Sequence, residues 1–361
     1  RLLETTRQYA REKLTAAGEE ETWCVRHRDY FLALAEEAHE KRFISEGPAL
    51  MKTLEREHDN CRAALDLCEA RSDAEAHLRL AGALNQFWAL RGHFREGRTR
   101  LAVALSRPDA QVSSPRARAL NGAANLARIQ SDNDAARLMY ERSAEIWRAL
   151  GQKRHLSMVL TNLGILEQQQ GRYDLSQALY DESLMLIREQ DDPAGLSLLL
   201  NNSGWLAYVQ GDPTRARALL EESLVLSRAI GNQIILELAG GNLADIAMKQ
   251  SDYATARVRF REVFALQAAS RNEHSLIKTL EIVGELAACL QQPGRGVRLF
   301  AAAAALSERR GTPVYPDDRA EYDRRKQLLR IALDEEAFSR EWEAGFALTT
   351  EEALALAQEI L

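Results

Sequence analysis

The sequence predicts an all-α fold in which helix-turn-helix units stack into a superhelix, flanked by further helices. Three observations lead to this fold class. A pattern of small and large residues recurs with a fixed forty-residue period, apolar residues fall at helical spacing inside each repeat, and a short turn-forming stretch divides each repeat in two. A plain helical bundle is the alternative, but a bundle does not need a fixed period. We therefore expect a solenoid of about six units over residues 76–311.

Four positions set the period because they keep their character from copy to copy. The first is small: Ala124, Gly164, Gly204, Ala244 and Gly284. Twelve residues later comes a second small residue: Ala136, Ser176, Ala216, Ala256 and Gly296. A large apolar residue stands four further on: Tyr140, Tyr180, Leu220, Phe260 and Phe300. Three beyond that is a smaller residue again: Ser143, Ser183, Ser223, Val263 and Ala303. An earlier copy, shifted by one residue, holds Asn85, Gly97, Leu101 and Ala104.

Each copy contains two predicted helices. In one copy, apolar spacing predicts helices over 158–170 and 175–189, separated by Gly-Arg-Tyr-Asp at 171–174. The equivalent breaks begin with turn-forming residues at Ser131, Gly211 and Ser251. Glycines spaced by two periods predict left-handed caps after the second helices: Gly151, Gly231 and Gly311. The small residues let helix backbones approach, and the large residue fills the groove between units.

Helical segments are also predicted on both sides of the repeats. Residues 1–20 form one amphipathic helix that ends near Gly18, a second helix opens at Arg26, and a third contains 54–65. Residues 21–75 then act as a helical linker, and 312–361 as a C-terminal helical cap. The acidic end of that cap could instead be a docking surface. The basic cluster at 324–326 has acidic neighbours, which argues against a nucleic-acid role.

Composition and motifs exclude most other function classes. The formal net charge of −6 argues against a dedicated nucleic-acid grip. The longest apolar run, 299–306, is far shorter than the ~20 residues that span a membrane. Four cysteines without a CxxC pair favour a reduced, cytoplasmic protein. No P-loop, HExxH, GxSxG or GxGxxG motif occurs, so we predict no enzyme activity, no cofactor and no metal. His58 with Asp59 is interpreted as a solvated pair rather than an acid–base group.

The repeat pattern resembles the tetratricopeptide repeat. That family has a small residue at the eighth position, an Ala-like residue at the twentieth, an aromatic residue at the twenty-fourth and a small residue at the twenty-seventh, in a unit of commonly about 34 residues. The unit here is longer, since it spans the step from Ala124 to Gly164, as in longer-helix variants of bacterial signalling regulators. The resemblance implies a right-handed superhelix in which each unit touches chiefly its neighbours.

The flanks resemble the sensor region of bacterial STAND-type ATPase transcriptional regulators of NB-ARC, LuxR-like or AfsR-like organisation. The resemblance is carried by LLETxRxYAxEKL at 2–14 and LExEHDNxRAAL at 54–65, and by the C-terminal segments 300–306, 336–338 and 350–353. It implies that residues 1–20 close a winged-helix-like subdomain and that the chain's own ATPase domain is a partner. The chain begins at Arg1 rather than Met, so we interpret it as a piece of a longer protein or a processed chain.

The tetratricopeptide resemblance also implies which residues line the concave groove, since the first helix of every unit faces it. The groove positions that we assign to a ligand are Arg118, Asn121, Asn125, Arg128, Asn162, Asn201, Trp205, Tyr208, Asp245 and Lys249. The last unit adds Lys278, Glu281 and Glu285. Asparagine amides suit an extended peptide because each can donate and accept a hydrogen bond. Trp205, Tyr208 and Met248 could form an apolar anchor.

Alternative roles exist for the same residues. The asparagines could cap and cross-link neighbouring helices, and Trp205 could pack between units, because buried polar groups need partners. An acidic tail folded over Arg118 and Arg128 would be autoinhibitory.

The two resemblances together imply a non-enzymatic sensor and protein-interaction module for signal transduction and transcription regulation. Its partner is a protein or peptide, or a small-molecule effector, with no direct contact to nucleic acid or membrane. The alternative is a stand-alone tetratricopeptide scaffold or co-chaperone that binds a client peptide.

Overall fold

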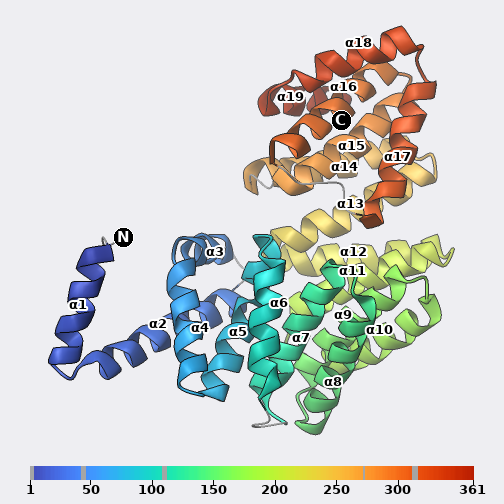
Figure 1. The fold of residues 1–361 in the computed structure, drawn as a ribbon. Coiled ribbons are helices and arrows are strands. Elements are labelled where there is room, and N and C mark those ends of the chain that lie inside the picture. Colours follow the sequence, from blue (N-terminus) through green and yellow to red (C-terminus); the bar gives the residue numbers. More distant parts are fainter. Residues whose placement is uncertain (1–3, 42–45, 108–111, 271–272, 311–315) are drawn as a thin grey trace. The chain divides into compact units, whose positions relative to one another are not determined.

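The computed structural model describes the chain except for residues 1–3, 42–45, 108–111, 271–272 and 311–315. The described residues form nineteen α-helices and contain no β-strand, which confirms the predicted all-α fold (Figure 1). They divide into two compact units, Arg1–Gly195 and Leu196–Leu361, with the boundary in the first turn of α11. Within the described part of the chain, no helix has the length and apolar character needed to cross a membrane.

Four helices precede the repeats. They are α1 (Glu4–Ala16), α2 (Glu20–Glu40), α3 (Gly47–Arg56) and α4 (His58–Ala70). The first helix ends before Gly18, whose φ is +68°, close to the predicted end. The second helix begins at Glu20, earlier than the predicted start at Arg26. The carboxylates in its first turn interact favourably with the positive end of the helix dipole. The third predicted segment is interrupted at Glu57, between α3 and α4. The ring of His58, which opens α4, lies against Phe87 of α5, with ring centroids 4.9 Å apart.

The repeats form six successive pairs of first and second helices. The pairs are α5 (Ala74–Leu90) and α6 (Phe94–Ser106), α7 (Ser114–Ile129) and α8 (Asn133–Ala149), α9 (Lys153–Gln169) and α10 (Tyr173–Arg188), α11 (Pro193–Val209) and α12 (Pro213–Ala229), α13 (Gln233–Lys249) and α14 (Tyr253–Ser270), and α15 (Glu273–Cys289) and α16 (Pro293–Arg310). Gly151 and Gly231 adopt φ of +66° and +67°, so the predicted left-handed caps are confirmed there. Gly311 lies outside the described residues.

The small positions of the repeat allow close helix contact. A Cβ added to Gly164 would lie 2.4 Å from Cε1 of Tyr180, and one on Gly204 would lie 2.7 Å from Cγ of Leu220. The serines at the fourth repeat position also have a polar role that the pattern did not predict. Three of them donate to the carbonyl oxygen 26 residues earlier: Ser143 to Ala117 at 2.7 Å, Ser183 to Ser157 at 2.9 Å and Ser223 to Ser197 at 2.7 Å. Each buried hydroxyl thereby joins the two helices of its repeat.

Three helices follow the last repeat: α17 (Pro316–Ile331), α18 (Glu335–Phe346) and α19 (Thr350–Ile360). Phe338 of α18 and Leu329 of α17 share a core with Val297 and Phe300 of α16. Residues of α19 join the core of α15 and α16 and include Ala353, Ala357 and Ile360. The C-terminal helices therefore cover apolar side chains of the last repeat.

A glycine pair tests the close helix contact. Gly164→Ala should lower the free energy of unfolding by about 1–3 kcal/mol, because the new methyl group would overlap the buried Tyr180 ring. Gly241 in α13 is the matched control, since a Cβ there meets nothing within 4 Å. Gly241→Ala should stabilise its helix by roughly 0.5–1 kcal/mol. Urea denaturation followed by circular dichroism measures both effects, and an equal change in the two variants would contradict the packing argument.

Candidate functional site

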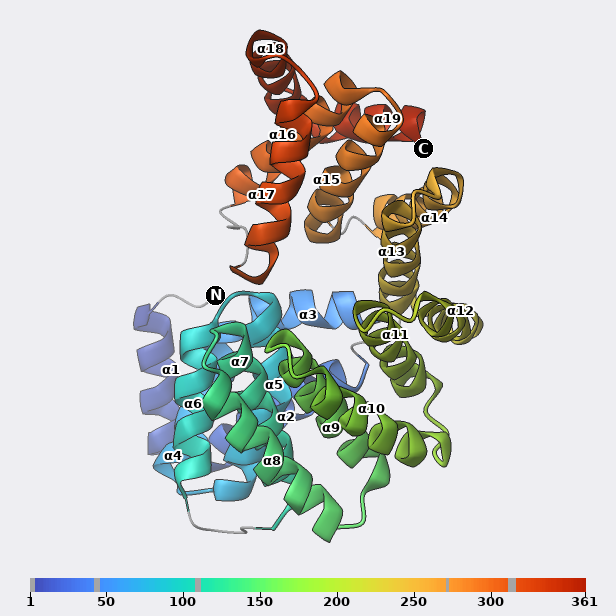
Figure 2. The same ribbon diagram turned by 90° about the vertical axis from the view of Figure 1, so that its right-hand side faces the viewer.

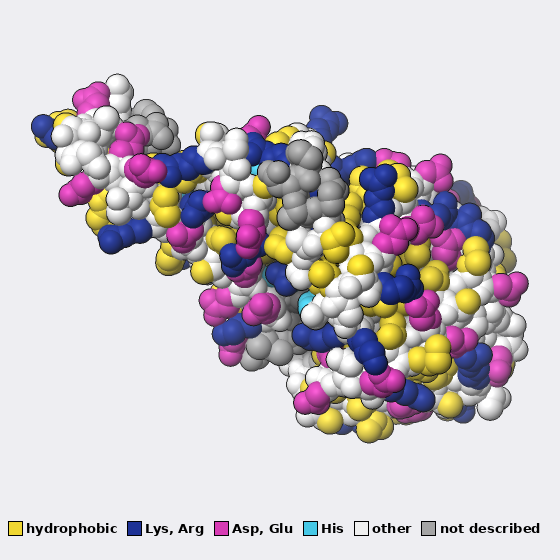
Figure 3. Space-filling model, turned by 90° about the horizontal axis from the view of Figure 1, so that it is seen from below, with side chains coloured by type: hydrophobic (Ala, Val, Ile, Leu, Met, Phe, Trp, Pro, Cys, Tyr) yellow, Lys and Arg dark blue, Asp and Glu magenta, His cyan; other side chains and the backbone are white. Residues whose placement is uncertain are grey.

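The candidate groove residues lie on first helices: α7 and α9 in the first unit, α11, α13 and α15 in the second. Charged side chains of both signs are interspersed over the face drawn in Figure 3. Such a mixed surface is typical of solvated helix faces. On this face the charge is spread over many small groups rather than gathered in one large field (Figure 3).

The asparagines pair with one another across successive first helices. In the first unit, Nδ2 of Asn162 donates to Oδ1 of Asn121 at 3.0 Å. In the second unit, Nδ2 of Asn242 donates to Oδ1 of Asn201 at 2.9 Å, in the same pattern two periods later. The acceptors Asn121 and Asn201 are buried, at 5% and 4% exposure. These amides therefore cross-link neighbouring repeats, which is the alternative role considered for them.

Three other candidates of the first unit also contact the array itself. Asn125 accepts a hydrogen bond from the Tyr140 hydroxyl at 2.6 Å. Arg128 donates from Nη1 to Oε1 of Gln169 at 3.1 Å, one repeat further on. The Arg118 stem packs beside Gly82 of α5, and its Cγ lies 3.5 Å from where a Cβ on Gly82 would stand. The two arginines remain half-buried, with part of each side chain facing solvent.

The second unit brings four candidates together in one cluster. Trp205 and Tyr208, one turn apart on α11, have ring centroids 5.7 Å apart. The ammonium of Lys249 lies 5.4 Å from the Trp205 ring and 5.8 Å from the Tyr208 ring, within cation–π range. Oδ2 of Asp245 lies 3.2 Å from the same Nζ. We call these four residues the aromatic–lysine cluster.

Met248 does not take part in this cluster. The sequence predicted it as a third member of the anchor, but its side chain is 7% exposed and belongs to the core formed by α13 to α16. Lys249, the next residue, takes that place instead. The prediction was wrong by one residue because the face of α13 that meets α11 is set by how the two helices pack. The resulting cluster combines an aromatic pair, a cation and a carboxylate.

Asp245 connects the aromatic–lysine cluster to a buried ionic network. Arg325 of α17, 4% exposed, donates from Nε to Oε2 of Glu285 at 2.9 Å. Its Nη2 lies 3.2 Å from Oε1 of Glu321 and 3.8 Å from Oδ1 of Asp245. Arg324 also donates to Glu285, at 2.7 Å, and to Glu321, at 2.8 Å. The hydrogen bond from Arg324 lowers the pKa of Glu321 to about 2.

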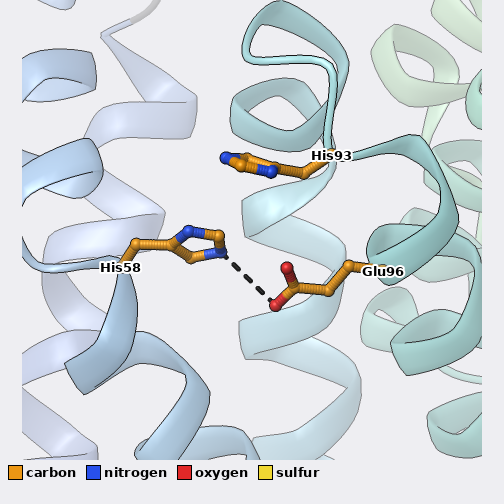
Figure 4. Close-up of side chains that lie close together, drawn as sticks. All are labelled: His58, His93 and Glu96. Carbon is orange, nitrogen blue, oxygen red and sulfur yellow. Dashed lines mark ion pairs between the residues drawn. The ribbon is translucent and has the colours of Figure 1, made fainter.

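A second charged cluster lies near the N-terminal end of the array (Figure 4). The His58 side chain is only 12% exposed, so the predicted solvated pair with Asp59 is not what the structure shows. Its Nε2 lies 3.4 Å from Oε1 of Glu96, and its ring lies 4.5 Å from the His93 ring. Burial is the main cause that lowers the pKa of His58. The local pattern of α4 could not reveal this contact, because Glu96 and His93 come from the following repeat.

The same cluster is the best candidate for a metal in the described chain. The ligand atoms of His58, His93 and Glu96 all lie within 4.8 Å of one another. However, Arg62 donates from Nε and Nη2 to the two carboxylate oxygens of Glu96, at 2.7 and 2.6 Å. This bidentate pair places a positive charge where a cation would bind. The arrangement therefore favours an ion pair that joins α4 to α6.

Two histidines with little exposure to solvent should make the first unit sensitive to acid. Burial lowers the pKa of both His58 and His77, and the His77 side chain is fully buried. The unfolded chain therefore takes up protons below about pH 6.5 that the folded chain resists, so stability should fall as the pH drops below this value. In His77→Phe the decrease of the unfolding free energy between pH 6.5 and 5 should be smaller. Parallel pH profiles for the variant and the parent chain would contradict this account.

Comparison with known proteins agrees with the fold. Residues 115–184 and 155–229 match the family model described as the tetratricopeptide repeat. Proteins of Mycobacterium tuberculosis and Mycobacterium bovis that are named as putative HTH-type transcriptional regulators are 40% identical over 97 residues. That match covers 27% of this chain and 11% of the length of each relative. The matched segment thus corresponds to a small part of these relatives.

Solved structures with similar folds share little sequence with the chain. A Rap conjugation gene regulator of the plasmid pLS20, in complex with the Phr* peptide, has a TM-score of 0.58 at 12% identity, over 92% of this chain and 98% of that one. A Rap protein complexed with Competence and Sporulation Factor has a TM-score of 0.55 at 12% identity, over 89% and 99%. The APC/C hetero-tetramer Cut9–Hcn1 has a TM-score of 0.56 at 17% identity, over 89% and 55%. These likenesses concern the fold alone, and with the family match they show an all-α fold with tetratricopeptide repeats over residues 115–229.

Proposed function

We propose that this chain is the non-enzymatic sensor and protein-interaction module of a larger cytoplasmic transcription regulator of the STAND type. The tetratricopeptide repeats support the interaction role, and the relatives named as HTH-type transcriptional regulators support the regulatory one. One Rap protein of similar fold was solved with the Phr* peptide, which favours a peptide as the ligand. A ligand that binds one packing arrangement better than another would bias the ATPase domain of the parent protein.

The aromatic–lysine cluster is the observation that carries this proposal. Trp205 and Tyr208 are half-buried, so their rings are held in place while part of each remains accessible. Aromatic residues of this kind commonly supply most of the binding energy at interfaces. Lys249 and Asp245 add one donor and one acceptor group beside the rings. The cluster can therefore hold an apolar side chain and the adjoining polar backbone of a peptide.

The test is capture of the natural ligand. The purified chain is exposed to lysate of its source cells and examined by native mass spectrometry, beside a Trp205→Ala, Lys249→Ala variant. We expect a retained peptide whose occupancy falls at least about tenfold in the variant, the scale of a lost interface anchor. Tyr173→Ala is the matched control, because this tyrosine is 37% exposed on a second helix of the first unit. The same retention in all three proteins, or no retained species, would contradict binding at the cluster.

A further inference from the structure

Helix α17 lies beside α15 (Figures 1 and 2). Its two central arginines, Arg324 and Arg325, contact carboxylates of first helices in the second unit. A helix that merely continued the stack would contact the last repeat alone. Arg325 instead reaches past Glu285 on α15, and its Nη2 comes within 3.8 Å of Asp245 on α13. The Arg325 side chain therefore reaches predicted groove positions of two successive repeats.

The receiving surface is acidic at matching positions of these two repeats. Asp245 and Glu285 are one repeat period apart, whereas the same position holds uncharged residues in the three repeats directly before them: Asn125, Ile165 and Trp205. Glu281 lies one turn before Glu285, and its negative charge, after burial, helps to raise the pKa of Tyr322 in α17. The cations on these first helices are Lys249, paired with Asp245, and Lys278. We call Asp245, Glu281 and Glu285 the acidic face.

The burial of Arg325 indicates that its ion pairs with the acidic face select a partner more than they stabilise the fold. Arg325 is 4% exposed, so its charge has lost nearly all contact with water. The cost of removing such charges from water offsets most of their attraction, and an apolar pair of similar size is often as stable. The planar guanidinium with its fixed donors is, however, well suited to selective pairing with carboxylates. A surface arranged in this way discriminates arginine from other side chains.

We infer that the acidic face is a binding site for a basic peptide segment with two adjacent arginines, and that α17 occupies it as an internal competitor. The inference rests on the proposed function and names the chemistry of the ligand. Leu329 anchors α17 separately, in the core with Val297, Phe300 and Phe338. Tyr322 of α17 packs against Phe300 of the same core, with ring centroids 4.9 Å apart. An incoming peptide would replace the contacts that Arg324 and Arg325 make with the acidic face, and it would meet the aromatic–lysine cluster next to Asp245.

The first experiment removes the internal competitor. A fluorescent synthetic peptide with the sequence of residues 316–331 is titrated against the full chain and against an Arg324→Ala, Arg325→Ala variant. We expect the variant to bind at least about tenfold more tightly, because a tethered competitor acts at a high effective concentration. Arg330→Ala is the matched control, since Arg330 belongs to the same helix but pairs with Glu335 outside the acidic face. This control should bind the peptide as weakly as the parent chain.

Two further changes test whether the acidic face is the receptor. Adding Asp245→Asn and Glu285→Gln to the double variant should abolish binding, and so should glutamine in place of both arginines in the peptide. Binding that survives either change, or no tighter binding by the double variant, would overturn the inference. The proposed function and this inference can fail independently of each other. A captured cellular peptide that depends on Trp205 and lacks arginine would support that function while contradicting the acidic face as its receptor.

A measurement on the parent chain keeps the test valid if the double variant does not fold. A large excess of the same peptide should speed amide hydrogen exchange in α17 and leave exchange in α19 unchanged. The peptide with both arginines replaced is the control and should change neither helix. Unchanged exchange in α17 under saturating peptide would overturn the inference.

Discussion

Replacing Tyr180 by alanine should lower the free energy of unfolding of the first unit by about 3–5 kcal/mol, the range for removing a buried aromatic ring. The ring is 1% exposed and fills the space above Gly164. Its hydroxyl donates to Oε1 of Gln168 at 3.2 Å, so truncation also removes a hydrogen bond. Because Tyr180 of α10 packs against α9, the lost stability should come mainly from the packing of these two helices within one repeat.

The matched control is Tyr173→Ala on the same helix. Tyr173 is 37% exposed at the start of α10, and its truncation should change the free energy by no more than about 0.5 kcal/mol. Urea denaturation monitored by circular dichroism compares the two variants. In a solenoid, each repeat is stabilised mainly by its neighbours, so the Tyr180 variant should also lose two-state behaviour as the first unit unfolds separately. Similar stability of the two variants would show that the large residue of the repeat does not hold the helices together.

Tyr180 also shows why the fold could be predicted from sequence. A repeat places the same residue types in the same environment again and again, so a steric requirement such as the one between Gly164 and Tyr180 becomes visible as a pattern. The turns were predictable for a similar reason. Gly151 and Gly231 adopt positive φ, a conformation that glycine accepts without steric cost, so their spacing marks the ends of helices.

The candidate site was predicted less well, because its details depend on contacts between repeats. The groove positions were assigned from helix spacing, yet the hydrogen bond from Asn162 to Asn121 depends on the distance between α7 and α9. Met248 and Lys249 are neighbours in sequence, and only the rotation of α13 decides which of them meets Trp205. The contacts of His58 were missed for the same reason, because its partners Glu96 and His93 lie in the first repeat, outside α4. One-residue shifts of this kind leave the sequence pattern unchanged while they exchange buried and exposed side chains.

The role of Arg325 was not predictable from its neighbours in sequence. The basic cluster at 324–326 stands among acidic residues, which is typical of a solvated face. The structure separates the three residues: Arg324 and Arg325 pair with Glu285, while Lys326 lies 4.6 Å from the Trp342 ring of α18. Residues two apart on a helix do not face the same side, so Lys326 has a different packing partner from Arg324.

Glu285→Ala should be the most damaging change in the second unit that removes no apolar side chain, lowering its free energy of unfolding by about 3 kcal/mol. Glu285 accepts hydrogen bonds from both Arg324 and Arg325, and its removal leaves the buried Arg325 with weaker contacts to Glu321 and Asp245. Glu335→Ala is the matched control, because Glu335 pairs with Arg330 at the exposed end of α17. Its effect should stay within about 1 kcal/mol, as for other exposed ion pairs. Urea denaturation of the two variants measures the difference.

A double variant separates the loss of a stabilising contact from the creation of an unpaired charge. If most of the damage in Glu285→Ala comes from the stranded Arg325, then Glu285→Met combined with Arg325→Met should be clearly more stable than Glu285→Ala. The two thioethers can pack against each other at little desolvation cost. A double variant as unstable as Glu285→Ala would instead mean that the ion pair itself holds α17 on the array. Recovery would mean that the ion pair adds little net stability to the docking of α17, as expected for a contact that a basic peptide can replace.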